Sequence, residues 1–189
     1  QLGPGYGEIY AIALSPDGKL LTSGGYFMPE DVIRLHDFQS GELLQILKGH
    51  ENVVSDLAFS PDGRWLASGS PDYTVRLWKR SGNRFSAGPV LKGHERHVYA
   101  VRLFEDSGRL RVVSASYDHT VRLWDADSGR ELGLGRHENR ANSLAVGPDW
   151  IASSGDDKTI RIWDYSLRPI RTIRSETNPA GLAAYADGN

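Results

Sequence analysis

One short segment returns four times along the chain and constrains its fold more than any other feature. The four copies read VIRLHD, TVRLWK, TVRLWD and TIRIWD, and their fifth positions are His36, Trp78, Trp124 and Trp163. These anchor positions recur at intervals of about 40 residues, a period typical of stacked supersecondary units that cannot bury their apolar faces alone. We therefore expect an array of similar units.

The composition sets limits on the class of protein. Of 189 residues, 39% are hydrophobic and 24% are charged, which is typical of a folded domain rather than a disordered chain. The net charge of −2 with scattered Lys and Arg predicts no nucleic-acid partner. The absence of cysteine excludes disulfides, zinc thiolate sites and a thiol nucleophile. No apolar run reaches the ~20 residues of a membrane helix, so we expect no membrane contact and a cytoplasmic location. Whether a leader peptide precedes Gln1 is left open.

The second copy shows the expected unit in detail. Apolar and β-branched residues predict strands at Val53–Ser60, Trp65–Ser70, Thr74–Trp78 and Pro89–Lys92. The segment Ser60-Pro61-Asp62-Gly63 separates the first two and suits a type I turn. Four short strands joined by turns predict one antiparallel sheet for each copy.

These residues resemble the WD-repeat family of β-propellers. The likeness is carried by Gly-His, the SPDG turn, a turn aspartate and Trp-Asp, which follow in register several times. It implies an all-β fold in which four-stranded antiparallel blades surround a channel, with about four blades present and an incomplete ring. The expected blades span residues 6–49, 50–93, 94–136 and 137–178 of one domain, and a fifth begins at 179–189.

The chain departs from the family pattern at several places. Blade one has His36 in place of tryptophan, lacks the opening Gly-His and carries an insertion near 26–29. Blade two has Lys79 after its tryptophan, and blade four opens with Gly-Arg-His. The segment Leu182–Gly188 aligns with Leu57–Gly63, which predicts a fragment of a larger propeller. Its missing blades would come from the rest of a longer chain or from a second copy.

A polar set recurs in three blades, with aspartate six and serine ten residues before each tryptophan. The resemblance implies that histidine, serine, aspartate and tryptophan form one hydrogen-bond network per blade. The three sets are His50, Ser68, Asp72 and Trp78; His94, Ser114, Asp118 and Trp124; and His137, Ser153, Asp157 and Trp163. The donor and acceptor capacities of these side chains match, so a buried network of this kind can be fully satisfied.

The same residues also invite a catalytic reading, which we consider the weaker one. Hydrolysis needs one exposed nucleophile beside an oxyanion hole, whereas this chain has three repeated sets and no GxSxG motif. The histidines fall one per blade and do not converge on a metal, so we expect no metal and no cofactor. An arginine two residues before each anchor suggests a structural role for Arg34, Arg76, Arg122 and Arg161.

Binding is expected on the loops of the top face. The family positions that line this face carry over to Tyr10, Ser55, His97, Tyr99, Tyr117, Arg140, Asn142 and Asp156. Aromatic and arginine side chains dominate interface hot spots, so blades three and four are expected to receive an acidic or aromatic peptide. The leading hypothesis is a non-catalytic scaffold for proteins or peptides, either by itself or as the docking or sensor part of a larger multidomain protein. The alternative is a small-molecule enzyme with its site at the channel mouth.

Overall fold

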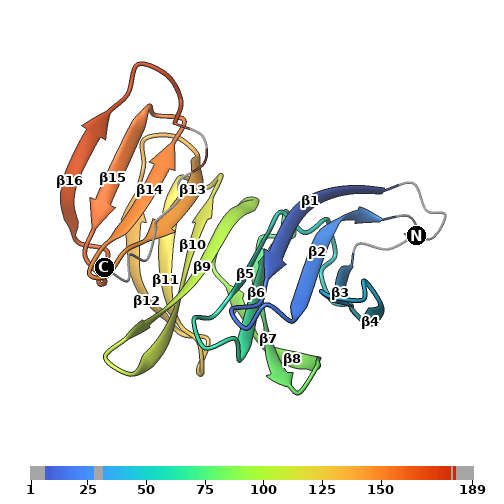
Figure 1. Cartoon of the computed structure of the whole chain (residues 1–189). Helices are drawn as coiled ribbons and strands as arrows, with labels where there is room; N and C mark the ends of the chain where they lie inside the picture. The colour runs from blue at the N-terminus through green and yellow to red at the C-terminus, as the bar shows by residue number, and fades with distance from the viewer. Residues whose placement is uncertain (1–6, 28–31, 180, 182–189) are drawn as a thin grey trace.

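Four antiparallel sheets make up the fold. The computed structural model describes residues 7–27, 32–179 and 181. Within these residues the strands form four sheets of four strands each, and the sheets follow one another along an arc that does not close into a ring (Figure 1). This confirms the all-β expectation of four-stranded antiparallel blades in an incomplete ring.

Each blade is built from four strands that are consecutive in the sequence and hydrogen-bonded in that order. Blade one contains β1 (Gly7–Leu14), β2 (Leu20–Phe27), β3 (Ile33–Asp37) and β4 (Leu43–Leu47). Blade two contains β5 (Asp56–Phe59), β6 (Trp65–Gly69), β7 (Thr74–Ser81) and β8 (Arg84–Lys92). Blade three contains β9 (Val98–Asp106), β10 (Arg109–Ser116), β11 (Thr120–Asp125) and β12 (Glu131–Arg136). Blade four contains β13 (Ala141–Val146), β14 (Ile151–Gly155), β15 (Thr159–Trp163) and β16 (Pro169–Arg174).

Several strand boundaries in blade two differ from the expected ones, and the third strand, β7, continues past Trp78 to Ser81. The first strand is only β5, because its pairing with β6 begins at Asp56 opposite Gly69. The fourth strand is longer than expected, since a turn with Gly82 at φ 61° keeps β7 and β8 paired as far as Ser81 and Arg84. Pro89 is tolerated inside β8 because this strand lies at the sheet edge and the register shifts there.

The hydrophobic core lies between the blades. The first strands β1, β5, β9 and β13 contact one another in succession. Apolar side chains of adjacent sheets form three buried clusters, one for each pair of neighbouring blades. Trp78, Trp124 and Trp163 each lie in one of these clusters and are at most 3% exposed. Each tryptophan therefore packs its blade against the preceding one.

The turn between the first and second strands of blade two forms at the SPDG motif, as the sequence predicts. In blade two the Gly63 amide donates to the Ser60 carbonyl over 2.9 Å, which closes the SPDG turn. The Ser60 hydroxyl bonds Asp62 at 2.6 Å and accepts from the Trp65 amide at 2.9 Å. The side chain of the motif serine thus satisfies backbone groups that the turn leaves free.

Two expected features fall outside the described residues. Residues 28 and 29 of the expected insertion near 26–29 lie there, and so does the segment Leu182–Gly188, which carries the expected first strand of a fifth blade. Of the expected fifth-blade start at 179–189, the structure describes only Pro179 and Gly181.

Candidate functional site

Each of blades two, three and four contains a buried hydrogen-bond network. In blade two the Trp78 indole N–H donates to the Ser68 hydroxyl over 3.0 Å, and His50 Nε2 lies 2.7 Å from the same hydroxyl. His50 Nδ1 lies 2.7 Å from the Asp72 carboxylate. Every group is satisfied when Nδ1 of a neutral imidazole donates to the carboxylate and the serine hydroxyl donates to Nε2.

Blades three and four repeat this geometry closely. In blade three the corresponding contacts join Trp124 to Ser114 at 2.9 Å, Ser114 to His94 at 2.7 Å and His94 to Asp118 at 2.8 Å. In blade four they join Trp163 to Ser153 at 2.8 Å, Ser153 to His137 at 2.7 Å and His137 to Asp157 at 3.0 Å. Blade one differs, because His36 stands at the anchor and its Nδ1 lies 3.2 Å from the Gly41 carbonyl.

Sequence reasoning missed two further members of each network. A threonine four residues before the anchor donates to the aspartate, from Thr74 at 2.6 Å and from Thr159 at 2.7 Å, and Thr120 does the same. The backbone amide after each histidine also donates to that aspartate. The threonine recurs in register in the sequence and could have been found there, whereas the amide could not.

The carboxylates of these networks are held ionised. Burial acts to raise the pKa of Asp157, but hydrogen bonds from Thr159, the Glu138 amide and His137 outweigh it and lower the pKa to about 2. The pKa values of Asp72 and Asp118 are lowered in the same way. Burial lowers the pKa of His137, so its imidazole stays neutral.

The network serines are unsuited to act as nucleophiles. Ser68, Ser114 and Ser153 are 0% exposed, and each hydroxyl is already engaged by an imidazole and an indole. A nucleophile has to reach its substrate, so these sets stabilise the blades rather than attack a carbonyl. In the described part of the chain, no group of three or more His, Asp or Glu side chains is arranged to hold a metal.

An aromatic group is formed by strand β9, by the β6–β7 and β10–β11 turns, and by the segments that lead into β9 and β13. We call Tyr73, His97, Tyr99, Tyr117 and Arg140 the ring array. Tyr99 stacks on Tyr117 with 4.3 Å between centroids and 9° between planes. His97 stacks with Tyr117 at 5.7 Å and with Tyr73 at 6.0 Å. The Arg140 guanidinium lies over the Tyr117 ring, 4.4 Å from its centroid.

The structure therefore brings together four of the expected top-face residues and adds a fifth. His97, Tyr99, Tyr117 and Arg140 meet in the ring array, and Tyr73 joins them from the turn of blade two. Nothing in the sequence singled out Tyr73, because its contact with His97 depends on how blades two and three pack.

The remaining expected residues make no ring contact with the array in the described part of the chain, although Asp156 and Tyr10 lie close enough to interact electrostatically with Tyr117 and Tyr99. Asn142 donates to Asp156 over 2.6 Å beside Arg140. Tyr10 is 55% exposed and bonds Glu8, and this hydrogen bond is the largest cause of its raised pKa. Ser55 precedes β5 and donates its amide to the Gly69 carbonyl over 2.8 Å. Among the described residues, no ring contact joins Tyr10 to the array.

A pocket of about 490 Å³ opens beside the ring array. It is lined by Tyr73, Glu95, Arg96, His97, Tyr117 and Arg140. Two guanidinium groups and one imidazole face a single carboxylate there, which favours a negatively charged ligand. Tyr73 and Tyr99 remain 45% and 41% exposed, so their rings are available to a partner.

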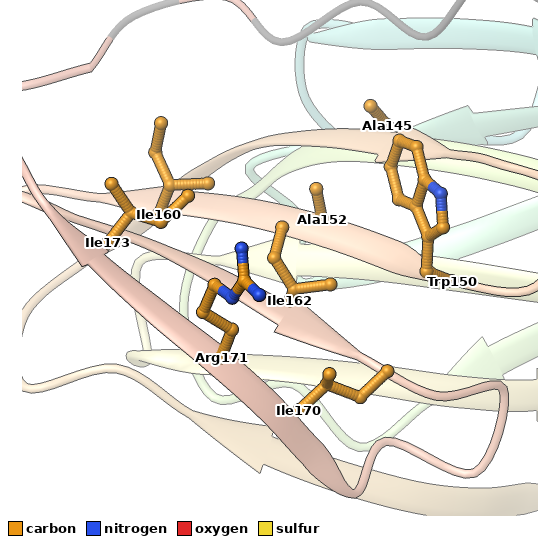
Figure 2. A pocket seen from close by; sticks show the side chains of 8 residues that line it. All are labelled: Ala145, Trp150, Ala152, Ile160, Ile162, Ile170, Arg171 and Ile173. Carbon is orange, nitrogen blue, oxygen red and sulfur yellow. The ribbon is translucent and has the colours of Figure 1, made fainter.

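A second hollow, of about 420 Å³, lies on the outer face of blade four. Figure 2 shows its side chains on one side of the β13–β16 sheet: Ala145, Trp150, Ala152, Ile160, Ile162, Ile170, Arg171 and Ile173. We call this surface the end face. Ile170 is 60% and Ile173 is 45% exposed. The corresponding face of blade three is instead buried, with Val121 and Leu123 packed against blade four.

The repeated sheets and their networks define a segment of a β-propeller of the WD type. The family model "WD domain, G-beta repeat" matches residues 2–31, 41–79, 87–125 and 133–164, so the chain belongs to this family. From the second match on, each match begins in or just before the fourth strand of one blade and ends in or just after the third strand of the next. One sequence repeat therefore links two neighbouring blades covalently.

Curated relatives share the repeat but are much longer. The chain is 33% identical to "Nuclear distribution protein PAC1-2" of Uncinocarpus reesii, over 84% of the chain and 40% of that protein. It is 29% identical to "Jouberin" of Rattus norvegicus and 26% identical to "Apoptotic protease-activating factor 1" of the same organism. These matches cover 87% and 95% of the chain but only 16% and 14% of the two relatives. The chain thus spans less than half the length of these relatives.

No helix in the described part of the chain has the length and hydropathy needed to cross a bilayer.

Proposed function

We propose that this chain is a non-catalytic interaction module that binds a peptide segment of another protein at the ring array. The observation that carries the proposal is the run of stacked rings from blades two and three, with Arg140 from the segment before blade four lying over Tyr117. Stacked tyrosines lose little conformational freedom on binding and offer large amphipathic surfaces, while arginine adds charge and planarity. Such residues dominate protein interfaces.

The expected partner segment is acidic and contains an aromatic residue. Its carboxylates would face Arg96 and Arg140, and its ring would lie on Tyr73 or Tyr99, which are both exposed. The net charge of the chain is only −2, so long-range electrostatic attraction contributes little to the approach of a partner. Recognition would therefore depend on the local pairing of rings and charges.

A peptide array tests this proposal. We expect acidic peptides with one or more aromatic residues to bind, with affinity measured by fluorescence polarisation. Tyr99→Ala combined with Tyr117→Ala is expected to weaken binding at least tenfold, because each aromatic hot spot contributes about 2 kcal/mol. Phe38→Ala removes a ring that is 53% exposed in blade one and is the matched control. A folded double variant that binds as tightly as the parent would overturn the proposal.

The enzymatic alternative makes a different prediction. It needs acidic or histidine side chains that converge at the channel mouth, often with a metal. A rise in melting temperature on addition of a divalent cation would favour it over a pure interaction module. The cytoplasmic location and the absence of a nucleic-acid partner likewise stay predictions.

We also propose that the end face docks against a further propeller blade. The equivalent faces of blades one, two and three are each covered by the next blade, which supports this occupant. The blade would come from the rest of a longer chain or from a second copy. A discrete dimer of the 189-residue chain in analytical ultracentrifugation would favour the second copy, and open-ended association would favour a longer parent chain.

A further inference from the structure

The arginine two residues before each tryptophan has a different environment in blade two than in blades three and four. Arg122 Nε donates to Thr120 over 3.3 Å, and its Nη1 bonds Glu131 at 2.6 Å. Arg161 Nε donates to Thr159 over 3.4 Å, and its Nη2 lies 3.5 Å from Asp157. Arg76 Nε is buried and has no hydrogen-bond acceptor among the residues that the structure describes.

The outer strands of blades two and three also differ in the residue that lies near this arginine. Glu131 is the residue of β12 that lies opposite Trp124. Ala87 occupies the same place in β8, opposite Trp78. Blade two therefore keeps the cation but replaces its acidic partner by a methyl group. Arg76 is half-buried, and its buried Nε without an acceptor carries a cost that an anion placed beside it would relieve.

Arg76 lines a pocket of about 320 Å³ between blades two and three. The other lining residues are Glu51, Asp72, Tyr73, Thr74, Lys92, Gly93 and His94. Asp72 is already engaged by His50 and Thr74, and His94 bonds Asp118 through Nδ1. The pocket therefore carries two cations, Arg76 and Lys92, against the carboxylate of Glu51 and the ionised Asp72, whose oxygens already accept hydrogen bonds.

We propose that this pocket binds an oxyanion, the carboxylate or phosphate group of a peptide that lies on the ring array. Tyr73 lines both this pocket and the one beside Arg140, so a single extended segment can occupy the two. The ligand group is planar or tetrahedral with at least two oxygens, which matches the fork of a guanidinium and the nearby ammonium of Lys92. Only the link to a peptide rests on the proposed function; the anion site itself does not.

The first experiment tests the pocket alone, with inorganic phosphate and acetate as probes. In an NMR titration we expect the Nε–H resonance of Arg76 to shift in a saturable way, while the same resonances of Arg122 and Arg161 stay in place. Saturation by phosphate but not by acetate would assign a phosphorylated ligand, and the converse an acidic side chain. No shift at Arg76, or equal small shifts at all three arginines, would overturn the site.

Two variants sharpen this test. Arg76→Gln is expected to lower the affinity for phosphate or acetate, whichever binds, at least tenfold. The affinity is read from the backbone resonances of Gly93 and Thr74. Glu51→Gln removes the carboxylate that repels the anion and is expected to tighten binding about threefold. Arg122→Gln is the matched control in blade three and should leave the Arg76 titration unchanged. Unchanged binding in a folded Arg76→Gln variant contradicts the proposal.

The link to a peptide is tested separately. An array-selected peptide with an acidic or phosphorylated residue should lose at least tenfold in affinity in Arg76→Gln, whereas its neutral analogue should bind parent and variant alike. Equal losses for both peptides, or none, would show that the peptide does not reach this pocket. Failure of the ring-array proposal would instead appear as no peptide binding while the phosphate or acetate titration still succeeds.

Discussion

The network serines are the residues on which the blades depend most directly. Ser153 has no exposed surface. Its hydroxyl is hydrogen-bonded both to the indole of Trp163 and to the imidazole of His137. Removing it leaves two buried polar groups without a partner in a place that water does not enter. The cost of such unpaired groups exceeds the modest gain of making one hydrogen bond.

Ser153→Ala is therefore expected to lower the free energy of unfolding by about 2 kcal/mol. Urea denaturation followed by tryptophan fluorescence measures this difference. Ser107→Ala is the control, because Ser107 is exposed and its hydroxyl bonds only Asp106, at 3.0 Å. A change for Ser153→Ala as small as that for Ser107→Ala would show that the network adds nothing to stability.

The same networks predict a loss of stability in acid. The pKa of Asp157 is lowered to about 2 in the folded chain, below the model-peptide value of 3.8. Its contribution of about 2 kcal/mol is present above pH ~4 and is lost as pH falls toward 2. Burial also lowers the pKa of His137, so the unfolded state takes up a proton first and stability falls below pH ~6.5.

Asp157→Asn combined with His137→Gln is expected to flatten this dependence. Thermal melts between pH 7 and pH 3 should show a smaller drop in melting temperature for the double variant than for the parent chain. An unchanged slope would mean that other groups cause the acid sensitivity.

At the scale of whole elements, polar side chains fix how one blade meets the next. The Gln45 amide of β4 donates to the Phe85 carbonyl and accepts from the Phe85 amide, both over 2.8 Å. Asp56 of β5 accepts from the Val101 amide at 2.9 Å and from Arg102 at 2.7 Å. These contacts hold an outer strand and a first strand in a defined register on the neighbouring sheet.

Asp56→Ala is expected to destabilise the pair formed by blades two and three by about 2 kcal/mol, since it leaves the Val101 amide without its acceptor and removes the anion paired with Arg102. Asp56→Asn keeps one oxygen and is expected to cost about half as much. Hydrogen exchange of the Val101 amide measures the effect locally. Equal exchange in Asp56→Ala and the parent would show that this amide does not need the carboxylate.

Much of this could be predicted from the sequence, and the limits have physical causes. The recurrence of Trp78, Trp124 and Trp163 at a fixed period predicts the blades because each element depends on local patterns of turns and alternation. Strand ends were less predictable, as β8 shows, because its length depends on a turn at Gly82 and on a sheet edge that accepts Pro89. Tyr73 could not be predicted as a neighbour of His97, since their contact arises only when two blades pack.

At the scale of the whole molecule, the two ends of the array are unlike its middle. The end face leaves Ile160 and Ile162 partly exposed, whereas Val121 and Leu123 at the equivalent positions of blade three are buried. On the opposite end, blade one exposes Ile12 at 68% and Leu14 at 47%. Apolar surface of this kind favours association, and the two faces are those that neighbouring blades use to pack on one another.

Ile162→Lys combined with Ile173→Lys is therefore expected to reduce self-association of the chain. Sedimentation at rising concentration should show a lower mean mass for this double variant than for the parent. Tyr73→Lys adds charge on the ring array, away from the end face, and is the control. The idea is wrong if both variants sediment like the parent.

The principal contacts between described blades join neighbours, so the blades form a linear series. Blade one is the only described blade whose anchor, His36, forms no bond to a buried serine. A load pulling on the two termini passes through the blades in series, so the weakest one yields first. Under stretching in an optical trap, blade one would detach before the three tryptophan-anchored blades and would leave the ring array intact.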